Sequence, residues 1–485
     1  MSDFRSHGVV LRAMRWNGVY SIFERITILA STFIVARLVG PGPFGDFAIA
    51  VGVSAVVGQL VETGAAQGLV HRKRIWPATT SAHTQVQIIS ALLRLGLAIV
   101  VLAPVSSLFG SDVAELLLGL SLIQLIWAFG ITPRVLMEKR LDFKRIAFVD
   151  GVALLLSSVG GVLAAEAGWG RYALLVGGTE PALILYTVQA LGNLAVGPHQ
   201  ERTRAWVSVR EVRWFLGFAR GFWLQAQFVP VVLHWDRLVI GYFFGPVQAG
   251  LYDVAGRIAY LPTRFVQQFI GRVMLPYYAQ IQSDKARIGM LLTRQLQAAG
   301  YLVTIFFIVF LLADWAGAVP LILGQDWQSI GVFVLGLSIA GWLRVVVFTL
   351  WPAIVGTGQT WALVRYTAIV AVLAFIAVPV LAVAYGVAGV LIGVTFATAI
   401  GTVALLRTMD PPWAGHPRTV PAILLVTSLG LLIGFASTVV IPRADVWIIS
   451  VTATLLVALS LAGRKTAILN LLSQLSGSSR GSWDG

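Results

Sequence analysis

The chain contains no cysteine, so disulfide bridges, thiolate metal sites and cysteine nucleophiles are all excluded. Charge is also scarce: only 12% of the 485 residues are Asp, Glu, Lys or Arg, about half of the share usual in a soluble domain. Hydrophobic types make up 58%. A soluble enzyme of this length needs far more polar surface. Long apolar runs recur from end to end, which predicts a polytopic membrane protein.

Basic residues nevertheless outnumber acidic residues, 35 to 21, and the formal net charge is +14. Nucleic-acid-binding proteins carry such an excess on a solvated face. Here part of it lies inside apolar segments, so we expect no nucleic-acid partner. A cleavable signal is not predicted either, because Arg12, Arg15, Glu24 and Arg25 interrupt the apolar core of about 7–15 residues that a signal peptide requires. We expect an uncleaved first span.

Apolar windows of about 20 residues predict an all-α polytopic membrane protein with about 14 transmembrane helices. Helices are expected because hydrocarbon cannot satisfy open backbone groups. The predicted spans are 16–39, 44–64, 86–109, 112–133, 147–165, 172–192, 215–245, 248–279, 289–313, 328–355, 361–384, 386–406, 419–441 and 445–462.

Loop charge predicts the orientation of these spans. The loops and ends on one side carry 22 Lys and Arg residues, whereas the other side carries only Arg171 and Arg443. Under the positive-inside rule, both termini are therefore cytoplasmic, which agrees with an even number of spans. The outer loops are very short, and the longest is expected from about Asp314 to Trp327.

The turns after spans 1 and 7 are similar in sequence. At an offset of 205 residues, Gly40 matches Gly245, Pro41 matches Pro246, Gly45 matches Gly250 and Phe47 matches Tyr252. Glycine and proline close a tight outer turn between antiparallel helices. The match predicts two six-helix lobes in the same direction, related by a pseudo-two-fold axis along the membrane normal. The expected parts are 1–200 (spans 1–6), 201–410 (spans 7–12) and 411–485 (two extra helices and a cytoplasmic tail).

Several segments, taken in order, carry a family resemblance. They are Ala36–Pro41 with Phe44 and Gly45, Gln67–Lys73, Arg134–Arg145, Asp236–Gly241 and Gly250–Tyr252. They resemble the prokaryotic polysaccharide flippases, the Wzx-type branch of the multidrug/oligosaccharidyl-lipid/polysaccharide exporter superfamily. The resemblance covers roughly spans 1 to 12.

The resemblance implies a two-lobed bundle with a central cavity in the cell inner membrane. Its implied activity is to flip an undecaprenyl-pyrophosphate-linked oligosaccharide to the outer leaflet, for surface polysaccharide such as exopolysaccharide or lipopolysaccharide. The partners we expect are this substrate, membrane lipid and other polysaccharide-assembly proteins, with H⁺ or Na⁺ as a coupling ion, and we expect no cofactor. The residues it marks are Gly40, Pro41, Gly45, Asp236, Arg237, Gly250 and Tyr252.

Eleven arginines and no lysine fall inside predicted spans. They are Arg25, Arg37, Arg94, Arg220, Arg237, Arg257, Arg264, Arg272, Arg294, Arg344 and Arg365. A charge that faces lipid costs at least ~2.5–3.5 kcal/mol at the bilayer centre. Those arginines that lie too far from a helix end to reach the interface are therefore expected to face a hydrated interior.

Helical spacing groups these charges with other polar side chains. One predicted face in span 7 carries Arg220, Trp223, Gln227, Pro230, His234 and Arg237, with a kink at Pro230. A face in span 8 carries Asp253, Arg257, Arg264 and Gln268. A face in span 1 carries Asn17, Tyr20, Glu24, Thr27 and Ser31. Guanidinium forks bind phosphate oxygens, and aromatic rings stack on sugars. The predicted substrate-binding residues are Tyr20, Arg25, Arg220, Trp223, Gln227, Arg237, Arg257 and Arg264.

An alternative role for these arginines is structural. They would pair with Glu24, Asp150, Glu180, Asp236 and Asp253 and lock helices together. Four of the acids, namely Glu24, Asp150, Glu180 and Asp253, are also candidates for binding a coupling H⁺ or Na⁺, because a buried carboxylate can carry a proton.

Three other functions remain open. A cation-coupled drug antiporter of the same superfamily would require an acidic interior, and here arginine is in excess. A polymerase or glycosyltransferase would require larger outer loops or an acidic metal-binding pair, and no Asp-x-Asp sequence occurs, so we expect no enzyme. A peptidoglycan-precursor flippase would differ only in substrate.

Overall fold

The computed structural model describes residues 2–62, 64–72, 76–140, 142–178, 186 and 209–409. Within them every regular element is a helix, so the predicted all-α class is confirmed for this part of the chain. The helices are α1 (Ser2–Val39), α2 (Pro41–Val61), α3 (Ala65–His71), α4 (Pro77–Phe109), α5 (Ser111–Lys139), α6 (Phe143–Glu166), α7 (Tyr172–Gly178), α9 (Val209–Ala226), α10 (Val229–Ala259), α11 (Leu261–Gln280), α12 (Lys285–Trp315), α13 (Ala318–Leu323), the 3₁₀ turn η1 (Gln325–Trp327), α14 (Ile330–Gly356) and α15 (Thr360–Thr408).

Seven of the described helices are long and apolar enough to cross a membrane. They are α2, α4, α5, α6, α12, α14 and α15. The chain is therefore a multi-span membrane protein. Predicted spans 13 and 14, and most of span 6, lie outside the described residues.

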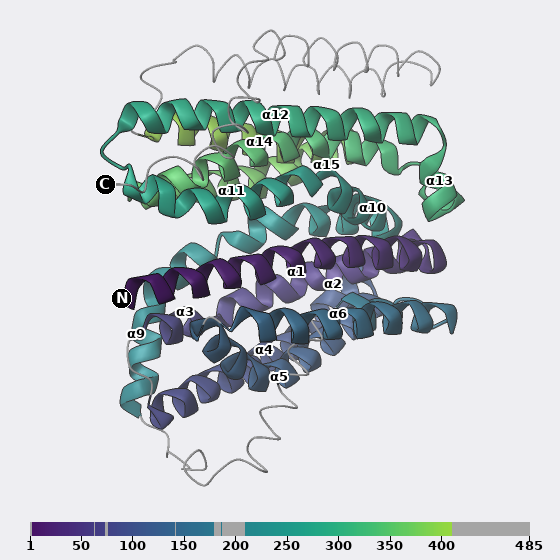
Figure 1. Cartoon of the computed structure of the whole chain (residues 1–485). Coiled ribbons are helices and arrows are strands. Elements are labelled where there is room, and N and C mark those ends of the chain that lie inside the picture. Colours follow the sequence, from purple (N-terminus) through teal and green to yellow (C-terminus); the bar gives the residue numbers. More distant parts are fainter. Residues whose placement is uncertain are drawn as a thin grey trace. The chain divides into compact units, whose positions relative to one another are not determined.

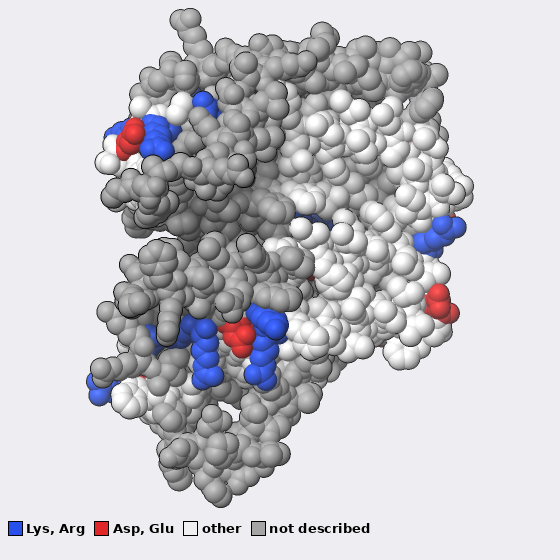
Figure 2. Space-filling view, viewed as in Figure 1, with Lys and Arg blue, Asp and Glu red and all other residues white. Residues whose placement is uncertain are grey.

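Helix contacts divide the chain into two compact units, residues 1–250 and 251–485. In unit 1, α4 packs against α5, α1 against α6, and α2 against both α4 and α5. The amphipathic helix α9 runs across the direction of α4 and α5 and packs on α3 and α4 (Figure 1). Figure 2 shows charged side chains near the ends of the unit 1 helices and uncharged surface between them, as expected for a membrane-embedded bundle.

In the described part of unit 2, α14 is the central helix. It packs against α11, α12 and α15, and 89% of its most apolar window is buried. Gly341 allows close approach to the end of α10, because a Cβ there would lie 3.1 Å from the Ala259 carbonyl oxygen. Thr263 Oγ1 of α11 donates to the Gly341 carbonyl at 3.1 Å. Small residues thus bring α14 close to its neighbours, as is usual between membrane helices.

The two similar turns adopt the same backbone conformation. Gly40 has φ 81° and ψ 172°, and Gly245, which interrupts α10, has φ 81° and ψ 176°. Proline follows each of them and starts the next helix. A residue with a Cβ adopts this positive φ only at a cost, so glycine is required at both positions. The predicted turn between spans 7 and 8 is confirmed.

These two turns also contact each other reciprocally within unit 1. A Cβ at Gly45 would overlap the carbonyl group of Pro246, and a Cβ at Gly250 would overlap that of Pro41. The contact is therefore between backbone atoms, and each turn contributes a glycine that faces the proline carbonyl of the other turn.

Several predicted span boundaries are wrong; α1, for example, begins at Ser2, whereas span 1 was expected from residue 16. Span 7 is not continuous: α9 ends at Ala226 and α10 begins at Val229, so its polar residues lie on two helices. Pro230 does not kink a helix; it occupies the first turn of α10, where its missing N–H removes no helical hydrogen bond. Span 8 is divided at Tyr260, with Pro262 in the first turn of α11.

Another error is the start of span 3, which was expected at residue 86. Helix α4 begins at Pro77, because its polar first turns find partners inside the protein. His83 Nδ1 and Thr84 Oγ1 each lie 2.8 Å from Thr132 Oγ1 of α5. The helix therefore continues beyond its apolar part.

Candidate functional site

Asp236 and Arg237 lie in the unit 1 part of α10, which packs closely on α2. A Cβ at Gly52 of α2 would lie 3.0 Å from Leu238. Asp236 is 7% exposed, and its Oδ1 accepts the Arg237 backbone N–H at 2.9 Å. Arg237 Nη1 donates to the Leu233 carbonyl at 2.8 Å and lies 3.1 Å from His234 Nδ1. These contacts hold the Arg237 guanidinium along its own helix.

The predicted polar stripe of α1 lies on one continuous helix. Tyr20, Glu24 and Arg25 are all half-buried, and Arg25 Nε is buried without a hydrogen-bond partner. Near the start of α10, Gln227 Nε2 donates to the Gln59 carbonyl of α2 at 3.0 Å. The side chains of Arg220 and Trp223, on α9, lie outside the described residues.

In unit 2 Asp253 and Arg257, which the sequence predicts on one face at the i,i+4 spacing that allows an ion pair, are paired. Arg257 Nε lies 2.9 Å from Asp253 Oδ2, and the Asp253 side chain is 8% exposed. The pair joins two positions four residues apart on α10, so it does not lock two helices together. Arg264, on α11, is half-buried. Arg344 of α14 stacks on Tyr260, with its Cζ 4.5 Å from the ring centroid. Unit 2 therefore gathers guanidinium groups and an aromatic ring at the break between α10 and α11.

Asp150, one of the coupling-ion candidates, accepts hydrogen bonds from two side chains. Arg134 Nη2 donates to its Oδ2 at 3.3 Å, and the Tyr186 hydroxyl donates to its Oδ1 at 3.1 Å. Arg134 also lies 3.1 Å from Glu138. Glu180 lies outside the described residues. Within the described ranges, no group of three or more His, Asp or Glu side chains is placed to hold a metal ion.

A polar cluster that was not predicted from the sequence anchors α9. Arg72 donates to both Glu211 oxygens, at 2.6 and 3.0 Å, and its Cζ lies 4.3 Å from the Trp214 ring centroid. Lys139 donates to the Leu69 carbonyl at 3.2 Å and also to the Arg72 carbonyl. The amphipathic pattern of 209–226 could have revealed the helix, but not its partner on α3.

Reversing the charge of Glu211 tests this anchor. Glu211→Arg places two guanidinium groups together, and we expect a lower unfolding temperature for the purified protein. The free energy of unfolding should fall by about 1.5–3 kcal/mol, the usual contribution of hydrogen bonds to charged groups. The double variant Arg72→Glu with Glu211→Arg should recover most of it. A double variant as unstable as Glu211→Arg would contradict the pairing.

A second missed contact lies within the spans. Arg94 Nη2 of α4 donates to the Ser54 carbonyl at 2.9 Å and to its hydroxyl at 2.8 Å. A Cβ at Gly58 would lie 2.7 Å from the Arg94 guanidinium. The arginine was expected at membrane depth, but its partner on α2 was not foreseeable from spacing within one helix.

Multiple apolar helices, several of them with an arginine inside the span, define a multi-span membrane protein. A sequence profile of the polysaccharide biosynthesis protein family matches residues 34–331, more than half of the chain, and the chain belongs to this family.

Individual relatives agree with this assignment. The chain is 26% identical over 342 residues to the lipopolysaccharide biosynthesis protein WzxC of Escherichia coli (strain K12). The aligned residues make up 68% of this chain and 67% of WzxC. It is 25% identical over 352 residues to the succinoglycan biosynthesis transport protein ExoT of Rhizobium meliloti (strain 1021), covering 70% and 69%. The predicted membership in the Wzx-type branch is confirmed.

One solved structure shows the same fold. It is the lipid II flippase MurJ in an inward closed conformation, with a TM-score of 0.67 over 92% of this chain and 97% of MurJ. The identity is 15%, so this likeness concerns the fold alone.

Proposed function

We propose that this protein flips an undecaprenyl-pyrophosphate-linked oligosaccharide across the inner membrane by alternating access, for polysaccharide export. The observation that carries the proposal is that each unit, taken by itself, holds a half-buried arginine within a predicted span, Arg237 in unit 1 and Arg257 in unit 2. A pyrophosphate is the anionic part of such a substrate, and paired N–H donors of arginine match phosphate oxygens. Family membership supports a polysaccharide precursor as the cargo.

The architecture we propose has 14 spans. Lobes 1–200 and 201–410 would be related by a pseudo-two-fold axis, with 411–485 added and both termini in the cytoplasm. The shared conformation of the Gly40 and Gly245 turns and their reciprocal contact support the repeat. Transport would then proceed by rocking of the lobes.

We infer transport without covalent chemistry by this chain, since its relatives are named for lipopolysaccharide biosynthesis and succinoglycan transport, and its fold is similar to that of a flippase. A drug antiporter is less well supported, because Asp150 and Asp253 are each held by an arginine rather than poised for a cation. Glu24, half-buried on α1, is the coupling residue we propose to test first. Other polysaccharide-assembly proteins are proposed partners.

Membrane vesicles from cells that lack the protein test the flipping step. Lipid-linked oligosaccharide should accumulate in the cytoplasmic leaflet, where it is open to a glycosidase added to inverted vesicles but not to right-side-out vesicles. When the protein is restored, the lipid-linked oligosaccharide should also become accessible to glycosidase added to right-side-out vesicles.

A drug-accumulation assay on the same cells separates the two transporter classes. Unchanged leaflet distribution together with altered drug accumulation would overturn the proposal in favour of an antiporter. In cells that lack the protein, we expect drug accumulation to be unchanged and the lipid-linked oligosaccharide to be retained in the cytoplasmic leaflet.

A further inference from the structure

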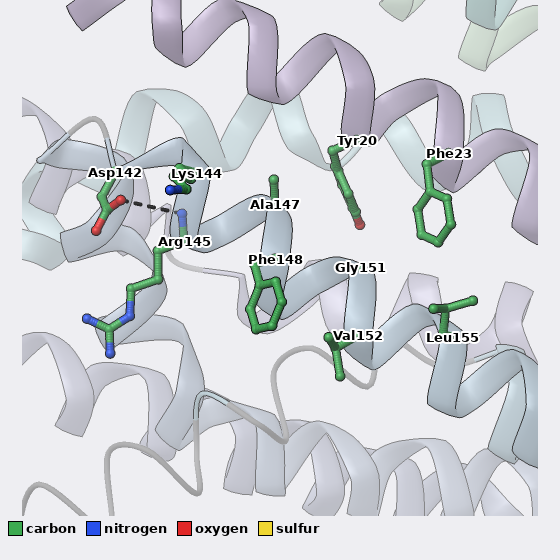
Figure 3. A pocket seen from close by; sticks show the side chains of 10 residues that line it. All are labelled: Tyr20, Phe23, Asp142, Lys144, Arg145, Ala147, Phe148, Gly151, Val152 and Leu155. Atoms are coloured by element: carbon green, nitrogen blue, oxygen red, sulfur yellow. Dashed lines mark hydrogen bonds between the residues drawn. The ribbon is translucent and has the colours of Figure 1, made fainter.

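An apolar groove lies between α1 and α6 in unit 1. Its volume is about 540 Å³, within the ~300–1,000 Å³ range of small-molecule sites. Its apolar lining comes from Phe23 of α1 and from Ala147, Phe148, Gly151, Val152 and Leu155 of α6. Figure 3 shows Tyr20 and Phe23 pointing from α1 toward α6. Phe148 is 71% exposed, so the groove opens to the surroundings of the protein.

All the charged residues of the groove lie at one end. Lys144 and Arg145 occupy the first turn of α6, together with the N-cap residue Asp142 (Figure 3). Asp142 Oδ1 accepts the Arg145 backbone N–H at 3.4 Å, so this carboxylate caps the helix. The three side chains sum to one positive charge, and the N-terminus of α6 adds the positive end of its dipole. This end of the groove therefore attracts an anion.

The length of the groove matches one leaflet. Arg145 and Leu155 are ten helical residues apart, which is about 15 Å at 1.5 Å per residue. The hydrocarbon core of a bilayer is about 30 Å thick, so this is half of it. Lys144 and Arg145 belong to a loop that positive-inside counting places in the cytoplasm. A single acyl chain would thus extend from the cytoplasmic headgroup region to the bilayer centre.

We propose that this groove binds an anionic glycerophospholipid of the cytoplasmic leaflet, with one acyl chain along α6 and the phosphodiester at Lys144 and Arg145. An acyl chain is preferred to a polyprenyl carrier, because a polyprenyl chain is several times longer than the groove. The site would hold membrane lipid against the N-terminal span, and it is independent of the proposed cargo.

A matched control exists on α12. There Asp284 caps the helix and accepts the Arg287 backbone N–H at 3.0 Å, and Lys285 and Arg287 supply the same charges. Arg287 lies near the Tyr277 ring, with its Cζ 5.8 Å from the centroid. The double variant Lys285→Ala with Arg287→Ala therefore removes equal charge from an equivalent motif outside the groove.

Native mass spectrometry of the purified full chain, titrated with phosphatidylglycerol or phosphatidylcholine, tests the proposal. We expect phosphatidylglycerol to bind preferentially. Lys144→Ala with Arg145→Ala should weaken this binding about 30-fold, from about 1 kcal/mol for each basic residue near an anionic headgroup. The α12 double variant should bind as the native protein does.

A second variant tests the groove without changing charge. Gly151 faces Phe23, whose Cε1 would lie 3.8 Å from a Cβ there, so Gly151→Phe fills the groove. It should lose phosphatidylglycerol binding although Lys144 and Arg145 remain. Equal binding of both lipids, an equal loss in the α12 variant, or unchanged binding in Gly151→Phe would each overturn the proposal. Displacement of phosphatidylglycerol by undecaprenyl phosphate at equal concentration would overturn it too, by assigning the groove to the carrier.

Discussion

Replacement of Gly45 or Gly250 by valine is expected to abolish polysaccharide export. A Cβ at either position would overlap the backbone carbonyl of the facing proline, Pro246 or Pro41. A backbone carbonyl cannot move away from the added Cβ by a rotamer change, as a flexible side chain can, so the two turns would be forced apart. The measurement is surface polysaccharide in cells that contain only the variant, with the amount of protein in the membrane determined in parallel.

Gly42→Ala is the control for these variants. Gly42 lies in the same turn, and its added Cβ would lie 3.8 Å from the Val247 side chain, which is ordinary contact. Export should remain at the native level. Normal export by both valine variants, at normal membrane abundance, would show that the close contact is dispensable.

Loss of Arg237 or Arg257 is expected to abolish export as well. Arg237→Ala removes a guanidinium from α10. Arg257→Ala also removes the ion-pair partner at 2.9 Å from the buried Asp253 carboxylate, so we expect a less stable protein. Stability and function must therefore be separated for Arg257. The measurement is surface polysaccharide together with the unfolding temperature of each purified variant.

The double variant Asp253→Asn with Arg257→Gln makes that separation. It removes both charges and leaves groups that can hydrogen bond to each other. If Arg257 only neutralised Asp253, export would return with stability. We expect a stable protein that does not export, because the pyrophosphate has lost a guanidinium. Full export by this variant and by Arg237→Ala would contradict a basic binding site.

Much of the helical pattern follows from the sequence, because apolar length and glycine-proline turns are local properties. The break at Gly245 was predicted from its match to Gly40, and the boundary between spans 11 and 12 falls at Gly386, where the backbone of α15 leaves helical geometry. The predicted span boundaries are wrong where polar residues continue or interrupt a helix. The early start of α4 depends on contacts of His83 with α5, which hydropathy does not contain.

The candidate site was predictable only within single helices. The spacing of Asp253 and Arg257 predicted their ion pair, which the structure contains. The partners described for Arg72 and Arg94, and Asp150 as a partner of Arg134, lie on other helices. Glu211, for example, is 139 positions from Arg72, and nothing in one sequence links them. The α1–α6 groove was missed for the same reason, since it exists only once the two helices are packed.

The reciprocal contact between the Gly40 and Gly245 turns has the form of an isologous interface, in which residue i of one copy meets residue j of another and the reverse. A half-length ancestor that carried one such turn could have made this contact with its own twin. Fusion of two copies would then have preserved the glycines at the former dimer axis, while the remaining sequence of each half was free to diverge.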